Sequence, residues 1–197
     1  MKEQSYKAMI DAVKSSPFMK KYIVWFNRLI TTTIYLLYPG LLVLLFLRSR
    51  SAGPEGAGGE AALNASGDAA GGAALSLGEG LIPAILIPGI SFVLLSIVRH
   101  MINAPRPYEV FDIEPIINKK TAGHSLPSRH IFSIFVIATT VFYYYPIAGV
   151  LIGLTGVALA MNRVMGGVHF IRDVVTGALT GIGCGLIGFY VILPLVV

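Results

Sequence analysis

The side chains of this chain that are best suited to chemistry occur in three short clusters between residues 99 and 173. In chain order these clusters are Arg99 with Arg106-Pro107, then Pro127-Ser128-Arg129-His130, and then Arg163 with His169 and Asp173. Residues 131–161, between the second and third clusters, carry no charge and are long enough for two short membrane crossings. Two crossings return the chain to the side that it left. We therefore expect the three clusters to meet at one face of a membrane protein.

The side chains in these clusters suit a phosphoryl group. A phosphate ester is cleaved when its negative oxygens are neutralised, a nucleophile attacks in line, and an acid protonates the departing oxygen. Arginine suits the first task because its planar fork binds two oxygens and because it keeps its proton at neutral pH. Arg99, Arg106 and Arg163 supply three such side chains.

The second cluster adds backbone donors. A proline in the first turn fixes the start of a helix, where free amides point toward a bound anion. We expect a helix to begin near Pro127, with Ser128 and the neighbouring amides in contact with phosphate.

Two histidines suit the attack and the proton transfer, because the unperturbed pKa of histidine is roughly 6.5. His169 and Asp173 are four residues apart. On one helical turn the carboxylate can therefore hold the Nδ1 proton of the imidazole. Nε2 of His169 is then available as the nucleophile, and His130 is the candidate acid.

The composition indicates an integral membrane protein. Of the 197 residues, 55% are hydrophobic and 13% are charged, and the mean hydropathy is +0.75, which argues against a water-soluble domain. The net charge of +5 does not indicate nucleic-acid binding, because the basic residues lie at the ends of apolar runs. The single cysteine, Cys184, lies in an apolar glycine-rich run, where we expect it to pack as a small hydrophobic side chain.

We predict an all-α protein, a polytopic bundle of about five transmembrane helices preceded by an amphipathic N-terminal segment at the membrane surface. The amphipathic segment covers residues 1–22 and the membrane domain covers residues 23–197. Within that domain the Gly/Ala-rich residues 51–80 are an expected flexible loop. The expected membrane helices span residues 29–47, 81–98, 127–144, 146–161 and 174–195.

Glycines that recur every four residues predict close contacts between helices. They are Gly177, Gly181 and Gly185 on the last helix, and Gly149 and Gly153 on the fourth. The remaining basic residues near the clusters are expected to anchor helix ends or satisfy backbone groups rather than bind phosphate. These are His100, Lys119, Lys120, His124 and Arg172.

The three clusters resemble the signature of the type 2 phosphatidic acid phosphatase family, written Lys-x6-Arg-Pro, Pro-Ser-Gly-His and Ser-Arg-x5-His-x3-Asp. The resemblance extends from about residue 81 to the C-terminus. This chain has Arg99 for the lysine, Arg129 for the glycine and Asn162 for the serine. Arg99 keeps the charge, the backbone amide of Arg129 can still bind phosphate, and Asn162 stays polar.

The resemblance implies an all-helical fold, a phosphohistidine intermediate and no metal ion or other cofactor. It also implies a role for each site residue. His169 is the nucleophile, Asp173 orients it, and His130 acts on the leaving group. The residues expected to bind phosphate are Arg99, Arg106, Ser128, Arg129 and Arg163.

We therefore predict an enzyme, a membrane phosphatase for a lipid phosphate or diphosphate such as undecaprenyl diphosphate, phosphatidylglycerol phosphate or phosphatidic acid. The expected partners are this substrate and the membrane lipids, with no nucleic acid and no obligatory protein partner. The expected location is a bacterial plasma membrane. Two alternatives stay open. One is a vanadate-dependent haloperoxidase-like enzyme, whose family shares the motifs but is generally soluble, and the other is a non-enzymatic protein that binds or transports lipid phosphates.

Overall fold

The structure is a computed structural model that describes residues 3–51, 80–118 and 121–196. These residues form helices and loops, and none of them forms a strand, which confirms the predicted all-α class. The expected flexible loop at 51–80 falls almost wholly outside the described residues. The helices are α1 (Glu3–Lys14), α2 (Pro17–Ser51), α3 (Leu81–Ile102), α4 (Pro107–Val110), α5 (Arg129–Tyr144), α6 (Pro146–Met165) and α7 (Ile171–Ile187), followed by the π-helical turn η3 (Gly188–Ile192) and α8 (Leu193–Val196).

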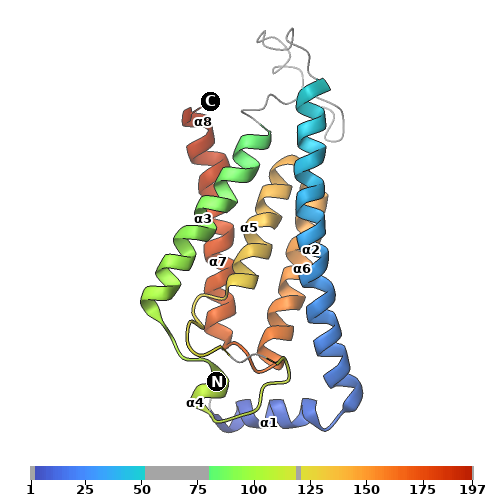
Figure 1. Cartoon of the computed structure of the whole chain (residues 1–197), viewed down its shortest axis with the longest axis vertical. Helices are drawn as coiled ribbons and strands as arrows, with labels where there is room; N and C mark the ends of the chain where they lie inside the picture. The colour runs from blue at the N-terminus through green and yellow to red at the C-terminus, as the bar shows by residue number, and fades with distance from the viewer. Residues whose placement is uncertain (1–2, 52–79, 119–120, 197) are drawn as a thin grey trace.

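The long helices α2, α3, α5, α6 and α7 run side by side, with α5 between the others (Figure 1). α5 packs mainly against α6 and α7, and most of its side chains from Ile131 to Val141 are buried. At the lower end of the view, α1 lies across the bundle beside α4 and the loops that join α3 to α5 and α6 to α7 (Figure 1). The residues of all three clusters lie in these loops or in the adjoining helix ends. The fold therefore brings the clusters to one end of the bundle, as the two-crossing argument predicts.

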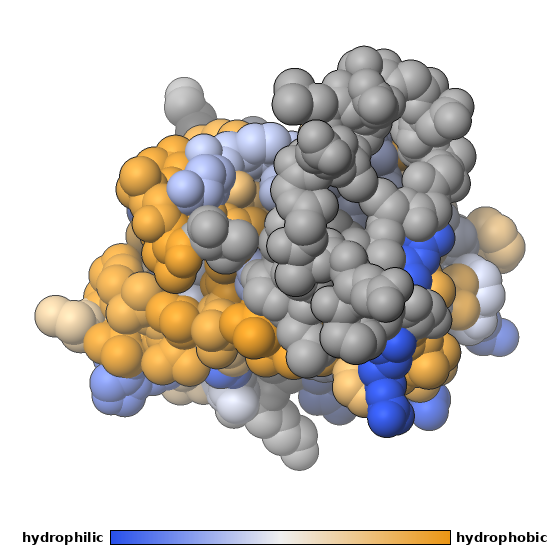
Figure 2. Space-filling model, turned by 90° about the horizontal axis from the view of Figure 1, so that it is seen from above, coloured by the Kyte–Doolittle hydropathy of each residue, from blue (hydrophilic) through white to orange (hydrophobic). Residues whose placement is uncertain are grey.

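Within the described residues, four helical segments are long and apolar enough to cross a membrane. They span residues 17–50, 81–110, 146–165 and 171–196. α5 has 16 residues, slightly fewer than the roughly 17 a crossing needs, but its neighbours surround it. Hydrophobic residues cover the visible flanks of the bundle (Figure 2). The chain is therefore a multi-pass membrane protein, in agreement with the prediction of about five membrane helices.

The first membrane helix begins earlier than the apolar run alone indicates. Residues 17–22, which the sequence assigns to the amphipathic segment, form the first turns of α2. Pro17 is the first residue of this helix, a position where the missing N–H of proline costs no hydrogen bond. α2 has 35 residues and is about 50 Å long at 1.5 Å per residue.

α1 is amphipathic, but its apolar face packs on the bundle. Tyr6, Ile10 and Val13 are buried. Tyr6 and Ile10 share a hydrophobic cluster with Val164 near the end of α6, and Val13 shares one with Val168 in the loop that follows. The predicted amphipathic N-terminal helix is therefore present, and it closes the end of the bundle that carries the clusters (Figure 1). Its location at the membrane surface stays a prediction.

The glycine spacing on α7 marks a close helix contact, as predicted. A Cβ atom at Gly177 would lie 2.8 Å from the carbonyl oxygen of Ser128, and one at Gly181 would lie 2.7 Å from that of Phe132. At Gly185 it would meet the side chain of Thr139 at 2.6 Å. α7 can therefore approach α5 this closely only because these three positions are glycines. On α6 the prediction holds for Gly149, which abuts Phe142 of α5, but not for Gly153, which has open space around it.

Candidate active site

The two arginines of the first cluster connect it to the other two. Arg99 lies in the last turn of α3, and its Nη1 donates a hydrogen bond of 2.7 Å to the carbonyl oxygen of Pro127. Arg106 precedes α4, and its guanidinium donates to the carbonyl oxygens of Gly123 at 2.9 Å and Val168 at 3.3 Å. Both side chains are buried. The first cluster therefore lies against Pro127 on one side and against the residue before His169 on the other.

The second cluster forms the start of α5, two positions later than the sequence predicts. The helix begins at Arg129 with Ser128 as its N-cap, so Pro127 lies before the helix and not in its first turn. The backbone N–H of Ser128 donates to the carbonyl oxygen of Asp173 at 2.9 Å. This bond joins the second cluster to α7. The first amides of α5 have no intrahelical acceptor, so they can donate to an anion at this end.

Two buried donors at this end of the bundle lack a partner within the described parts of the chain. They are Nε of Arg163, in the last turn of α6, and the hydroxyl of Ser128. Arg163 is 3% exposed and forms none of the salt bridges found there. Buried polar groups are almost always paired, so unpaired ones call for a ligand or water. An oxyanion such as phosphate is a suitable acceptor for donors of this kind.

His169 and Asp173 come together, but not on one helical turn. α7 begins at Ile171, so His169 lies in the loop before it while Asp173 lies in its first turn. Nδ1 of His169 is 3.6 Å from Oδ2 of Asp173, longer than a strong charge-assisted hydrogen bond. The same carboxylate oxygen accepts from the backbone N–H of Phe170 at 3.0 Å. The helix start thus fixes the carboxylate beside the imidazole.

Ser125 is a site residue that the sequence analysis does not select. Its hydroxyl donates to Oδ2 of Asp173 and lies 3.3 Å from Nδ1 of His169, and the side chain is fully buried. It therefore bridges the histidine and the carboxylate. Its place two residues before Pro127 is the only sequence signal that could have identified it.

The environment of His169 keeps its ring uncharged at neutral pH. The pKa of His169 is lowered to about 4, mainly by burial and also by the charges of Arg106 and Arg163, against the opposing effect of Asp173. Because Nδ1 faces Ser125 and Asp173, Nε2 lies on the other side of the ring. An uncharged imidazole held by Nδ1 is the form that can attack phosphorus through Nε2.

Tyr6 of α1 is a second residue that the sequence analysis misses. Its hydroxyl lies 3.1 Å from the carbonyl oxygen of Val164 and 3.3 Å from that of His169, so its proton is shared between them. The ring is fully buried and packs against Phe111 and Phe170. Burial raises the pKa of Tyr6 above its ordinary value, so the hydroxyl stays protonated and donates. No motif marks this residue in the sequence, because its partners are backbone atoms of a distant loop.

The other two predicted residues of the second cluster, Arg129 and His130, lie at an apolar groove and a polar pocket. The side chains of Arg129 and His130 line an apolar groove beside α2, at the end nearest the three clusters, and Arg129 also lines a polar pocket beside α3. His100 and His124, expected to be anchors, line the same polar pocket. Arg172 is exposed and lies 3.6 Å from Oδ1 of Asp173. Lys119 and Lys120 lie outside the described residues.

No group of three or more histidine, cysteine or acidic side chains lies close enough to hold a metal ion in the described ranges 3–51, 80–118 and 121–196. The positive charges that converge here are the guanidinium groups of Arg99, Arg106 and Arg163, which bind anions. The absence of a metal from the reaction stays a prediction.

The family model of the PAP2 superfamily matches residues 80–195, which include all three clusters and more than half of the chain. The chain belongs to the PAP2 superfamily. Membership confirms the predicted family and assigns the chain to its membrane phosphatases. The roles of the individual residues stay predictions.

Two solved structures share the PAP2 fold seen here. The crystal structure of Aquifex aeolicus LpxE is 23% identical, with a TM-score of 0.64, and the similarity covers 95% of this chain and 93% of that chain. The first transmembrane PAP2 type phosphatidylglycerolphosphate phosphatase from Bacillus subtilis is 19% identical, with a TM-score of 0.59, over 98% of this chain and 84% of that chain. No curated protein sequence matches the chain.

Proposed function

We propose that the chain hydrolyses a lipid phosphate or diphosphate through a phosphohistidine intermediate at His169. One observation carries the proposal. A buried, uncharged His169 is held by Nδ1 next to Ser125 and Asp173, while Arg106 packs against the preceding residue. Such a site supplies a nucleophile and a cation within reach of one phosphoryl group.

The reaction proceeds in two displacements. Nε2 of His169 attacks phosphorus, the bond from phosphorus to the leaving oxygen breaks, and His130 gives its proton to that oxygen. A water molecule then attacks the phosphohistidine, His130 takes a proton from the water, and the P–N bond breaks to release inorganic phosphate. Arg99, Arg106 and Arg163, the hydroxyl of Ser128 and the amide of Arg129 stabilise the charge on the phosphoryl oxygens. Asp173 stabilises the proton on Nδ1 throughout.

An apolar groove supports a lipid as the leaving group. It has a volume of about 400 Å³, begins at Arg129 and His130, and is lined mainly by apolar side chains of α2 and α5. Three of its residues, Ile34, Tyr38 and Ile137, also line a second apolar groove of about 380 Å³ that reaches Tyr145. Together the two grooves follow α5, whose 16 residues span about 24 Å. A hydrocarbon chain can lie along this path with its oxygen beside His130.

The finer substrate proposal follows the same chemistry. Phosphatidic acid, phosphatidylglycerol phosphate and undecaprenyl diphosphate each join an accessible terminal phosphate to a long hydrocarbon. One structural neighbour is named as a phosphatidylglycerolphosphate phosphatase, and both neighbours come from bacteria, which supports a role in a bacterial plasma membrane.

Rapid quenching tests the intermediate. Purified protein mixed with a radioactive lipid phosphate should give a phosphoprotein that is labile in acid and stable in base, and His169→Ala should give none. Label retained by His169→Ala, or a folded wild-type protein that releases no phosphate from any of these lipids, would contradict the proposal.

A comparison of leaving groups tests the role of His130. His130→Ala should lose much less activity on p-nitrophenyl phosphate than on a lipid phosphate, because p-nitrophenolate departs with little need for a proton. His169→Ala should lose activity on both substrates. If the two variants lose the same fraction of activity on both substrates, the assignment of His130 as the acid and His169 as the nucleophile is wrong.

Chelation tests the proposed independence from metals. Because arginines neutralise the phosphoryl charge, we expect phosphate release to continue in EDTA. Activity lost in EDTA and restored by a divalent cation would contradict this mechanism.

A further inference from the structure

The polar pocket beside α3 and the apolar groove beside α2 meet at one side chain. The polar pocket has a volume of about 250 Å³, and its lining includes Arg99, Arg106, Arg129, Thr121, His100 and His124. Arg129 lines both this pocket and the apolar groove. The motif of the family has glycine at this position, so the side chain is a feature of this chain.

The pocket has an excess of positive charge. None of its lining residues is acidic, and the salt bridges in the described part of the chain include none of its three arginines. The positive charges of Arg106 and Arg129 are both close enough to Arg99 to repel its guanidinium group. A terminal phosphate carries about two negative charges, and Arg99, Arg106 and Arg163 suffice to neutralise them. Arg129 is therefore a cation in excess of what one phosphate needs.

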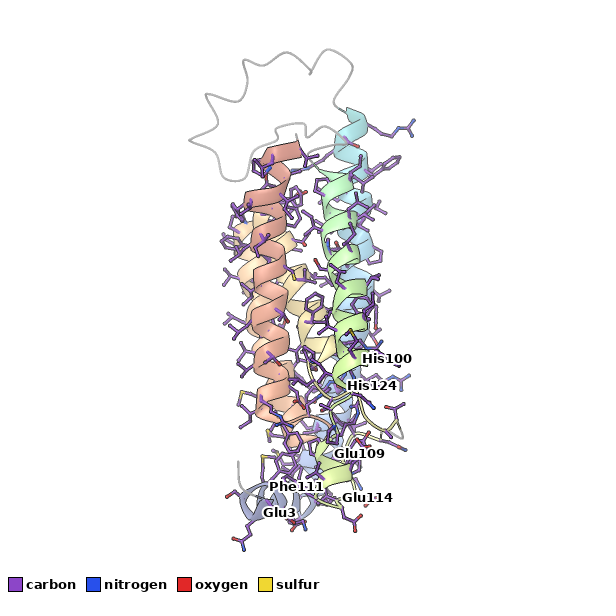
Figure 3. All side chains as sticks on the ribbon, turned by 90° about the vertical axis from the view of Figure 1, so that its left-hand side faces the viewer. Glu3, His100, Glu109, Phe111, Glu114 and His124 are labelled. Carbon is purple, nitrogen blue, oxygen red and sulfur yellow. The ribbon has the colours of Figure 1, made fainter. Side chains whose placement is uncertain are left out.

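Two histidines extend this cationic pocket. The rings of His100 and His124 stack with centroids 4.9 Å apart and planes inclined by 16°, and the two residues lie together beside the end of α3 (Figure 3). Nδ1 of His124 is 3.4 Å from the carbonyl oxygen of Arg99. A carbonyl only accepts, so this nitrogen donates. This bond and the ring stacking hold the pair in the lining of the pocket, beside the arginines.

We propose that Arg129, together with the stacked His100 and His124, forms a second phosphate subsite, and that the substrate is a lipid diphosphate. This inference rests on the proposed function. The inner phosphate of such a lipid is bonded both to the terminal phosphate and to the hydrocarbon. It must therefore lie where the polar pocket meets the apolar groove, which is the position of Arg129.

The reaction on a diphosphate follows the same two displacements. Nε2 of His169 attacks the terminal phosphorus, and the bond from that phosphorus to the bridging oxygen breaks. The lipid monophosphate leaves, with its charge stabilised by Arg129 and a proton supplied by His130. Water then releases inorganic phosphate from the histidine, so that one water is consumed for each bond cleaved.

Matched substrates test the subsite. Phosphate release is measured with farnesyl diphosphate and farnesyl monophosphate, which share a hydrocarbon, and with inorganic pyrophosphate, which has none. The wild type should have the highest kcat/KM on farnesyl diphosphate. Arg129→Gln should lower that value by roughly tenfold to a hundredfold, the effect of one lost charge-assisted hydrogen bond, and should lower the ratio of diphosphate to monophosphate turnover. Arg129→Lys should recover part of the ratio, and His124→Gln should lower it by a smaller factor.

The control is Arg50→Gln, which removes a positive charge that is also exposed, in the last turn of α2, and should leave the ratio unchanged. Each variant must keep the wild-type melting temperature in detergent.

Equal losses on both farnesyl substrates in Arg129→Gln, or a wild type that prefers the monophosphate, would overturn the second subsite while leaving the phosphatase intact. Equal turnover of inorganic pyrophosphate and farnesyl diphosphate would overturn the lipid part of the inference. Release of no phosphate from any of the three substrates would instead contradict the proposed function.

Discussion

The hydroxyl of Ser125 donates a hydrogen bond to Oδ2 of Asp173, and the two atoms are 2.5 Å apart. Both side chains are completely buried and lie 48 positions apart in the sequence. The hydroxyl also lies closer to the imidazole of His169 than the carboxylate does, at 3.3 Å against 3.6 Å. Ser125 is therefore a positioning residue that completes the contact between the nucleophile and its carboxylate.

Removal of the Ser125 hydroxyl should slow the reaction without weakening substrate binding. In Ser125→Ala the imidazole loses its nearer neighbour, and the carboxylate loses a donor. We expect kcat to fall by roughly tenfold to a hundredfold, the effect of a buried hydrogen bond left unmade, with little change in KM. Ser125→Thr, which keeps the hydroxyl, should recover part of the rate. Ser49→Ala is the control, because the hydroxyl of Ser49 donates to the carbonyl oxygen of Phe46 in the same helix, in the last turns of α2 and away from the site. A kcat near that of the wild type in Ser125→Ala would mean that Asp173 holds His169 alone.

Arg163 should contribute to turnover at the expense of stability. Its buried Nε lacks a partner in the described part of the chain, and a buried charge without a partner is costly. Arg163→Met should therefore lower kcat/KM by roughly a hundredfold to a thousandfold, while its melting temperature in phosphate-free buffer should equal or exceed that of the wild type. Added orthovanadate should raise the melting temperature of the wild type, because a ligand stabilises the state that binds it, and should have less effect on the variant. A variant that melts lower but keeps its activity would show that Arg163 is purely structural.

The imidazole of His169 should stay uncharged well below the usual titration range of histidine. Burial is the main cause that lowers the pKa of His169 to about 4, whereas the unfolded chain titrates near 6.5. Between these values the unfolded state binds the proton more tightly, so stability should decrease as the pH falls from about 6.5 toward 4. Nitrogen NMR of labelled protein in detergent should show a neutral ring at pH 5.5. A ring that titrates near pH 6.5 would contradict the buried, desolvated site.

The sequence predicts the helices of this fold and the residues of the three clusters, because both leave periodic or spaced signals. Apolar runs identify α3, α6 and α7, and the return of the chain across the membrane places the clusters at one end. Boundaries are less well predicted. The apolar run starts at Leu29, yet α2 starts at Pro17, because the tertiary packing of Ile23 extends the helix into less apolar sequence.

Contacts to backbone atoms and to distant loops are not predictable in the same way. The spacing of His169 and Asp173 fits a helical turn, but the structure has a loop before α7, because Asp173 accepts from Phe170 and thereby starts the helix. Ser125 and Tyr6 have no spacing that relates them to His169. They reach it only because the bundle brings α1 and the α3–α5 loop to the same end.

Loss of the Tyr6 hydroxyl should loosen the loop that carries the nucleophile. In Tyr6→Phe, the buried carbonyl oxygens of Val164 and His169 lose their shared donor. We expect a destabilisation of about 1–3 kcal/mol and a fall in kcat that is larger than any change in KM. The control is Tyr22→Phe, since the side chain of Tyr22 is 44% exposed. Equal kcat values in the two variants would show that α1 does not influence the His169 loop.

The close approach of α7 to α5 should be sensitive to a single methyl group. A Cβ atom at Gly181 would lie 2.7 Å from the carbonyl oxygen of Phe132, whereas one at Gly183, also on α7, has nothing within 4 Å. Gly181→Ala should therefore destabilise the protein by about 1–3 kcal/mol, as overpacking does, while Gly183→Ala should be neutral or stabilising because alanine favours a helix.

The same change should reach the site, because α7 carries Asp173, whose carbonyl oxygen accepts from Ser128 at the start of α5. Gly181→Ala should therefore also lower kcat, and Gly183→Ala should not. Stability can be followed by the rate at which a thiol-reactive dye labels Cys184, the single cysteine of the chain, on α7 itself. Faster labelling and slower turnover in Gly181→Ala alone are the expected result. Equal behaviour of the two variants would mean that the α5–α7 contact does not position the site.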